Sequence, residues 1–190
     1  KRVKKKNIRL LDGKPMIQYV IDAAKESGCF DEIWINSESE VLEKISIESG
    51  VKFYKRSDKL CADHVGSDLF VCDFIQNVNC DTIVQILPTS PFITAQHIKE
   101  FVKLSDSVDT LISTTPVRIE SLYKGEPINF DHNKPTPPSQ DLVPVEAYAC
   151  SLMSWNAENY INNMKKYGCA YHGGDGTKST FQITGFAALD

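Results

Sequence analysis

The stretch Thr82-Ile-Val-Gln-Ile-Leu87-Pro88-Thr-Ser-Pro91 decides the fold. Its first six residues form an apolar run rich in β-branched side chains, which is typical of a strand buried inside a sheet. The two prolines and two hydroxyl residues that follow predict a turn. Helical spacing of apolar residues over 67–78 precedes the strand, and a second helical pattern that Thr94 can cap follows it. A strand between two helices predicts an α/β arrangement.

Alternating signals continue outward from this stretch. Before it, the spacing predicts helices over 15–28 and 40–49 and strands over 33–35 and 51–54; after it, a strand over 109–115. Such alternation over the first 115 residues predicts a largely parallel sheet with helices on both faces. Ligands in such folds bind beyond the carboxyl ends of the strands. We therefore expect the N-terminal loop, the Asn36-Ser-Glu38 turn and the turn over 88–94 on one rim.

The pattern changes after residue 115. Residues 116–145 contain six prolines and little periodicity, which predicts a long excursion or interaction arm. A strand over 148–155 and a helix over 158–167 are expected beyond it. The Gly173–Thr180 stretch has three glycines but lacks the Gly-Lys-Ser/Thr order of a phosphate loop, so we expect a flexible surface loop there.

Composition narrows the class of protein. The 190 residues are 42% hydrophobic and 24% charged, as in an ordinary globular protein, and we expect one domain over 1–190. The net charge of −4 argues against a nucleic-acid binder. The sequence contains no apolar stretch of about eighteen residues, so it predicts no membrane span. Six cysteines without a CxxC pair are typical of the reducing cytoplasm. Cys61-Ala-Asp-His64 lacks the second ligand pair of a zinc site.

The N-terminal loop is strongly basic. Lys1-Arg2-Val-Lys-Lys-Lys6-Asn7-Ile-Arg9 places six cations in nine positions, and an Asp12-Gly13 turn signal and a helix start at Pro15 follow. Cations next to a helix start are suited to binding a polyphosphate. Charge alone fits a solvated tail or a nucleic-acid arm equally well. The order of the residues favours the polyphosphate site.

This order resembles the nucleotide-binding signature of the sugar-activating cytidylyltransferases, the family of the CMP-acylneuraminate synthetases. The loop and Leu87-Pro-Thr-Ser-Pro91 are the specific matches, and weaker ones lie at 31–38, 54–63, 138–142 and 188–190. The resemblance spans nearly the whole chain. It implies a Rossmann-like nucleotide-diphospho-sugar transferase fold with a largely parallel mixed sheet. It also implies that the family's first strand precedes Lys1 and that a second metal-motif aspartate follows Asp190.

The resemblance further implies transfer of CMP from CTP to a nonulosonic or related sugar acid, with release of pyrophosphate. Lys6 and Arg2 would be catalytic, acting on the α-phosphate and on the β- and γ-phosphates. The implied nucleotide-binding residues are Asn7, Arg56, Ser67, Pro88, Thr89 and Ser90. Leu87 and Gln140 would contact the sugar, and Asp190 would bind Mg²⁺. A cytoplasmic homodimer is implied, with the proline-rich excursion as its exchange arm and with neither nucleic acid nor membrane as a partner.

Three residues depart from the family pattern. Leu87 stands where the family has Gln, and Ile93 and Ser139 stand where it has Arg. The resemblance implies that these positions belong to the sugar side of the site, so the departures concern the acceptor more than the CTP. The alternatives are a scaffold or nucleotide-binding module that has lost catalysis and a nucleotidyltransferase for another sugar phosphate. Simpler interpretations also remain for Ser67, as a helix cap, and for Arg56, as a surface ion-pair residue.

Overall fold

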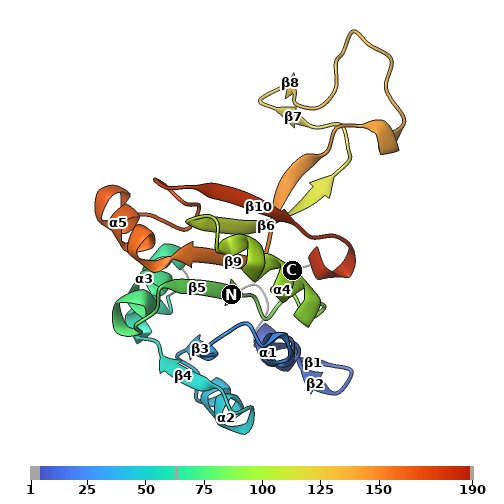
Figure 1. Ribbon diagram of the computed structural model, residues 1–190. Coiled ribbons are helices and arrows are strands. Elements are labelled where there is room, and N and C mark those ends of the chain that lie inside the picture. The colour runs from blue at the N-terminus through green and yellow to red at the C-terminus, as the bar shows by residue number, and fades with distance from the viewer. Residues whose placement is uncertain (1–4, 63, 189–190) are drawn as a thin grey trace.

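The computed structural model describes residues 5–62 and 64–188 (Figure 1). Its largest sheet has the strand order β10-β6-β9-β5. These strands are β10 (Lys178–Gln182), β6 (Thr110–Val117), β9 (Val145–Asn156) and β5 (Thr82–Ile86). β9 is antiparallel to both β5 and β6, whereas β10 is parallel to β6. The sheet is therefore mixed, and the expected α/β class is confirmed.

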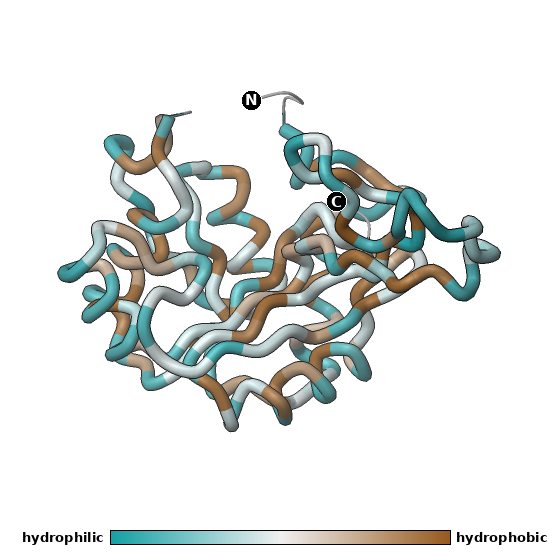
Figure 2. The backbone as a smooth tube through the Cα atoms, turned by 90° about the horizontal axis from the view of Figure 1, so that it is seen from above, coloured by the Kyte–Doolittle hydropathy of each residue, from teal (hydrophilic) through white to brown (hydrophobic). Residues whose placement is uncertain are grey.

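Helices cover both faces of this sheet. On one face, α1 (Met16–Ser27) and α4 (Ala95–Ser105) pack against alternate strand residues such as Leu111 and Leu152. On the other, α3 (Ser67–Asn77) and α5 (Ala157–Tyr167) pack against Ile112, Met153 and their neighbours. Adjacent strand residues point to opposite faces, which explains why consecutive apolar residues serve two separate cores. Figure 2 shows hydrophobic segments along the central strands and hydrophilic ones in the outer loops.

A second, two-stranded sheet lies beside the first. Its strands, β3 (Trp34–Ser37) and β4 (Lys52–Lys55), are parallel and are joined by α2 (Glu40–Glu48). The ring of Phe74 in α3 meets the rings of Trp34 and Tyr54 edge-on, with centroids 5.9 and 5.2 Å away. These contacts attach the small sheet to α3.

A cavity of about 1750 Å³ separates the two sheets. Its walls are β3 and β5 together with residues of α1, α3 and α4. Within the described residues, β3 bonds to β4 alone and β5 to β9 alone, so the edges that face the cavity carry no partner strand. The strand that the family resemblance implies before Lys1 lies outside the described residues.

The chain reaches α1 through a small hairpin. A 3₁₀ turn η1 (Lys6–Ile8) leads into β1 (Leu10–Leu11), which pairs with β2 (Lys14–Pro15). Asp12 and Gly13 have φ of 48° and 76°, values that favour Asp-Gly in a tight hairpin turn. The predicted turn is confirmed, but the basic segment does not lead directly into the helix. The helix begins at Met16, one residue after the expected Pro15.

Between β6 and β9 the chain leaves the main body (Figure 1). This arm contains the short hairpin β7 (Leu122–Tyr123) and β8 (Glu126–Pro127) and the 3₁₀ turn η3 (Ser139–Asp141). Five large apolar side chains on it are exposed: Ile119, Leu122, Tyr123, Ile128 and Val143. The remaining 3₁₀ turns are η2 (Asp58–Leu60) and η4 (Gly185–Ala188).

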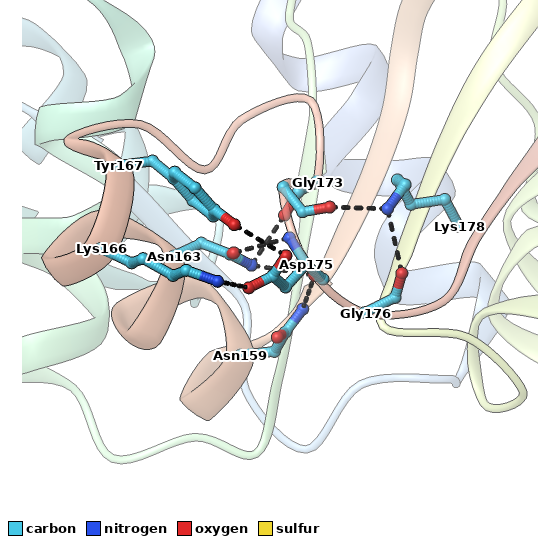
Figure 3. A network of polar contacts seen from close by, with 9 residues as sticks. Asn159, Asn163, Lys166, Tyr167, Gly173, Asp175, Gly176 and Lys178 are labelled. Atoms are coloured by element: carbon cyan, nitrogen blue, oxygen red, sulfur yellow. Dashed lines mark hydrogen bonds and ion pairs between the residues drawn. The ribbon is translucent and has the colours of Figure 1, made fainter.

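The expected surface loop over Gly173–Thr180 is partly wrong. Its last three residues belong to β10, which pairs with β6 from Lys178↔Thr110 onward. The preceding residues form a loop that buried Asn163 holds, because its amide donates to the Gly173 carbonyl at 2.7 Å and accepts from the Asp175 N–H at 2.7 Å (Figure 3). None of the helices in the described ranges combines the length and apolar character that a membrane crossing requires.

Candidate functional site

The basic turn and the ends of three strands meet at one end of the cavity. Lys5, Lys6 and Asn7 line this end together with Ser37, the last residue of β3. The residues that follow β3, β4 and β5 also line it, namely Glu38, Arg56, Leu87, Pro88 and Thr89. The structure therefore brings six of the sequence-predicted site residues to one place: Lys6, Asn7, Arg56, Leu87, Pro88 and Thr89. We call this place the cavity rim. It lies beyond strand ends, where α/β folds bind ligands.

The basic turn has a defined local conformation. Lys5 adopts φ of 54°, and the N–H groups of Ile8 and Arg9 donate to the carbonyls of Lys5 and Lys6, each at 3.1 Å. Ile8 packs on the cluster formed by α1, α2 and β3, which attaches the turn to the body. Lys6 is exposed and Asn7 is half-buried. A cation and an amide are thus presented side by side to an anionic ligand.

The Arg56 guanidinium is held by neighbouring groups. Its Nε donates to Asn36 Oδ1 at 2.9 Å, and one Nη donates to the Asn36 carbonyl at 2.6 Å. Its face lies over the Phe70 ring, 4.4 Å from the centroid. A planar guanidinium that is both bonded and stacked has few orientations open to it. Arg56 is half-buried, so it is not a freely moving surface side chain.

The turn that follows β5 is attached to β9. The Leu87 N–H donates to the Ser151 carbonyl at 3.1 Å, and the Ser90 N–H donates to the Leu87 carbonyl at 3.0 Å. Ser90 is fully buried, and its hydroxyl donates to Ser151 Oγ at 3.1 Å. The Ser90 side chain therefore points into the protein, whereas Pro88 and Thr89 line the cavity, Thr89 with only 8% of its surface exposed. Ile93, which departs from the family pattern, is a core residue with 3% exposure.

Two predicted site residues lie away from the rim. Ser67 is the first residue of α3, and Gly66 occupies the N-cap position, so the expected cap was wrong by one residue. Gln140 is exposed in η3 of the arm, where its carbonyl accepts from Arg118 at 3.4 Å. The remaining two, Arg2 and Asp190, fall outside the described residues.

Sequence reasoning missed the residues that shape the rim. Asn36 and Phe70 were not assigned to the site, although they fix Arg56 from 20 and 14 positions away. Glu38 also lines the rim and accepts a hydrogen bond from the Cys61 thiol at 3.5 Å. Burial, and next the hydrogen bond to Glu38, raise the pKa of Cys61, so this cysteine stays a neutral thiol. Of these residues, only Asn36 and Glu38 could have been found from the sequence, because the Asn36-Ser-Glu38 turn follows a predicted strand.

A magnesium ion bound together with a nucleotide would need few protein ligands at the rim. No cluster of three potential metal ligands occurs among residues 5–62 and 64–188. Mg²⁺ in nucleotide sites keeps several waters and needs only one or two carboxylates besides the phosphates. The chain before Asp190 runs close to the Leu87–Ser90 turn, because the Ser151 hydroxyl that accepts from Ser90 also donates to the Ala187 carbonyl at 3.0 Å.

Several known proteins are similar to this chain in sequence. The N-acylneuraminate cytidylyltransferase of Streptococcus agalactiae is 35% identical over 167 residues, 82% of this chain and 40% of that protein. N-acylneuraminate cytidylyltransferase A of Danio rerio is 32% identical over 137 residues, 66% of this chain and 32% of that protein. The CMP-N,N'-diacetyllegionaminic acid synthase of Legionella pneumophila is 30% identical over 127 residues, 63% and 55% of the two chains. The chain spans well under half the length of the first two relatives.

Solved structures share the fold at low sequence identity. A CMP:2-keto-3-deoxy-manno-octonic acid synthetase complexed with CTP superposes with a TM-score of 0.68 at 13% identity, over 96% of this chain and 85% of that one. The 4-diphosphocytidyl-2C-methyl-D-erythritol synthase of Anaerococcus prevotii also gives 0.68, at 9% identity, over 97% and 86%. The expected nucleotide-diphospho-sugar transferase fold is thereby confirmed. A family model described as cytidylyltransferase matches residues 1–136, more than half of the sequence, and the chain belongs to this family.

Proposed function

We propose that the protein transfers CMP from CTP to a nonulosonic or related sugar acid, releasing pyrophosphate and forming a CMP-sugar. The observation that carries this proposal is the meeting of Lys6, Asn7 and Arg56 with the Leu87–Thr89 turn at the cavity rim. Membership of the cytidylyltransferase family supports the chemistry. The names of the acylneuraminate and diacetyllegionaminate relatives support a sugar acid as the acceptor.

The reaction needs charge neutralisation and positioning rather than covalent catalysis. An oxygen of the sugar acid attacks the α-phosphorus of CTP, and the bond from that phosphorus to the pyrophosphate oxygen breaks. Lys6 would neutralise the α-phosphate, where negative charge develops in the transition state. Arg2 would bind the departing phosphates, and Asn7 would read the nucleoside through its amide. Bound Mg²⁺, held through Asp190, would supply further charge neutralisation on the triphosphate.

The acceptor pocket should be less polar than the family pattern implies. Leu87 lines the rim and packs against the α3 core, and Ile93 is buried, so neither position offers a donor for a carboxylate or hydroxyl. A polar sugar group facing Leu87 would lose a hydrogen bond, at a cost of about 1–3 kcal/mol. We therefore propose a deoxy or diacylated nonulosonate as the acceptor in preference to N-acetylneuraminate.

Pyrophosphate release tests this proposal. The chain would be assayed with each of the four NTPs and with N-acetylneuraminate, Kdo and diacylated nonulosonates. We expect activity chiefly with CTP, and use of N-acetylneuraminate about ten- to a hundredfold below that of the preferred acceptor. Best activity with N-acetylneuraminate would contradict the proposed acceptor. CTP binding without pyrophosphate release from any acceptor would favour the alternative, a module that has lost catalysis, which the departures at Leu87, Ile93 and Ser139 motivate.

We also propose a homodimer in a reducing cytoplasm. The exposed apolar side chains of the arm, with Leu122 57% and Tyr123 65% exposed, support a partner surface. Gln140 lies on the same arm, so a partner's arm would deliver it to the sugar, together with the cations of Arg118 or Lys134. Six free thiols support a reducing compartment. Sedimentation velocity should show a dimer that becomes a monomer in a Leu122→Asp/Ile128→Asp variant; a wild-type monomer would exclude the exchange arm.

A further inference from the structure

The guanidinium of Arg56 binds a single residue near the end of β3. Arg56 is the first residue after β4, and its N–H donates to the Ser37 carbonyl at 3.0 Å, which continues the pairing of the two strands. Its Nε donates to Oδ1 of Asn36 at 2.9 Å, and its Nη2 donates to the carbonyl of the same residue at 2.6 Å. These two donors are neighbours in the guanidinium plane. Asn36 therefore occupies one whole edge of the plane, with one acceptor from its side chain and one from its backbone.

The backbone of β3 directs this contact to the cavity side. The carbonyls of Ile33 and Ser37 accept from Lys52 and Arg56 on the β4 side. Because these groups alternate in direction along a strand, the Asn36 carbonyl points away from β4 and toward the cavity. Within the described residues no strand pairs with this edge, and Nη2 of Arg56 supplies the donor that the carbonyl needs. The contact thus holds the guanidinium at the cavity wall, which both residues line.

The ring of Phe70 supports the same guanidinium from its face. Its centroid lies 4.4 Å from Cζ of Arg56. Phe70 belongs to α3 and packs against the buried cluster that includes Val71 and Trp155, so the core fixes the ring. An aromatic contact on the face restricts the tilt of the guanidinium plane, and the two bonds to Asn36 restrict its rotation within that plane. The direction of the opposite edge is thereby set.

We propose that Asn36 is a positioning residue that makes Arg56 present its opposite edge to the nucleotide. That edge consists of Nη1 and the second N–H of Nη2, and no hydrogen bond within residues 5–62 and 64–188 engages Nη1. A fork of two donors binds a pair of neighbouring acceptors. Two phosphate oxygens form such a pair, as do N3 and O2 of cytosine, whereas uracil carries an N–H at N3. The inference rests on the proposed function in one respect, that Arg56 binds the nucleotide.

Nuclear magnetic resonance of the arginine side chains tests the positioning role without nucleotide. Asn36→Ala removes the Oδ1 acceptor and should accelerate solvent exchange of the Arg56 Nε–H about tenfold, the factor for one lost hydrogen bond. Asn36→Asp keeps an acceptor at the same place and should restore slow exchange. Asn77→Ala is the matched control, because it removes an amide that bonds within α3, and it should change the exchange less than about twofold. Equal exchange in the wild type and Asn36→Ala would overturn the proposal.

Calorimetric titration with CTP connects the position of Arg56 to binding. Asn36→Ala should raise the Kd for CTP about tenfold, for the same lost hydrogen bond. In an Arg56→Ala background the same substitution should have almost no further effect, because a positioning residue acts only through its partner. Phe70→Leu keeps an apolar contact with the core but removes the ring face, and it should weaken binding about threefold. Additive losses from Asn36→Ala and Arg56→Ala would overturn the proposal, since an indirect structural effect does not require Arg56.

Titration with UTP identifies which acceptors the fork binds, because CTP and UTP carry the same phosphates. A loss in Asn36→Ala that is confined to CTP would place the base on Arg56, and an equal loss with UTP would place phosphate oxygens there. Unchanged binding of both nucleotides would overturn the role of Asn36. A wild-type chain that binds no nucleotide would refute the proposed function, while the exchange of the Arg56 Nε–H would still decide whether Asn36 positions this side chain.

Discussion

The ammonium group of Lys6 lies in the basic turn at the rim, next to the amide of Asn7. If it neutralises charge that develops on the α-phosphate, Lys6→Ala should lower kcat about a hundredfold or more and change the KM for CTP much less. Steady-state kinetics measure both parameters. Arg2→Ala is the comparison, because it should mainly weaken binding of the triphosphate. Unchanged turnover in Lys6→Ala would remove this residue from the catalytic set.

At the residue scale, the sequence predicted which side chains occur near the site better than where they point. Arg56 reaches the rim because it follows β4, whereas Lys6 and Asn7 reach it in the basic turn that precedes β1. Ser90 belongs to the same specific motif, yet its hydroxyl is buried against Ser151. No local pattern predicts this, because the direction of Ser90 depends on a partner 61 positions away. Asn36 was missed for the same reason: its contact with Arg56 is tertiary.

The loop before β10 is held not only by Asn163 but also by one acidic residue, Asp175. Asp175 accepts from Lys166 Nζ at 2.6 Å and from the Tyr167 hydroxyl at 2.8 Å, both on α5 (Figure 3). On the other side, Lys178 donates to the carbonyls of Gly174 and Gly176. The glycine carbonyls of this loop thus bind an ammonium group, which is the opposite of what a phosphate loop requires.

Acid should weaken this loop through Asp175. The hydrogen bond from Lys166, and next that from Tyr167, hold the pKa of Asp175 below its ordinary value of 3.8. The stabilisation is therefore complete above about pH 4 and is lost as the pH falls through the folded-state value. The melting temperature of Asp175→Asn should lie below that of the wild type at pH 5 and approach it toward pH 2. Asn163→Ala, which removes a buried group that does not titrate, should cost about 1–3 kcal/mol at every pH. A wild-type advantage over Asp175→Asn that is constant with pH would contradict this role.

Elements with a strong local signal were predicted well. Thr94 caps α4 with a reciprocal bond to His97, and Gly28 ends α1 with φ of 64°. β10 was missed because its sequence, Lys-Ser-Thr-Phe-Gln, is polar and short. It is a strand because β6 offers a parallel edge, with Phe181 packing edge-on against Phe101 of α4. Pairing with β6 therefore stabilises β10 as a strand, although its residues have a low propensity for one.

On the scale of the whole molecule, the order of the strands is the part that the sequence could not supply. The alternation of helices and strands predicted the layers, but β9 inserts antiparallel between β5 and β6, which are consecutive in the chain. This insertion depends on contacts that form only after the arm has left and returned to the sheet. The separation between β3 and β5 is also a property of the whole molecule, since helices and strands that are far apart in the sequence line it.

The two edges that face the cavity are suited to a strand. Residues 81 and 87 direct backbone bonds to β9, so alternation turns the N–H and C=O groups of Thr82, Val84 and Ile86 toward the cavity. The backbone N–H and C=O groups of Trp34 in β3 also face the cavity, because the carbonyls of Ile33 and Ser37 accept hydrogen bonds from Lys52 and Arg56 on the β4 side. The buried Oε1 of Gln85 has no hydrogen-bond partner among the described residues. Unpaired backbone groups beside apolar walls are costly, and a further strand would satisfy them.

We therefore predict that, in a longer form of this chain, a segment before Lys1 pairs with both β3 and β5. It should run parallel to β5, since its carboxyl end must join the basic turn at the rim, and it should be apolar on both faces because helices cover both. Amide exchange at Trp34, Val84 and Ile86 should be about a hundredfold slower in a chain extended by its natural preceding residues than in the 190-residue chain. Amides that already bond between β6 and β9, such as those near Leu111, serve as the control and should change far less. Equal exchange at the β3 and β5 edges in the two forms would show that the segment does not enter the cavity.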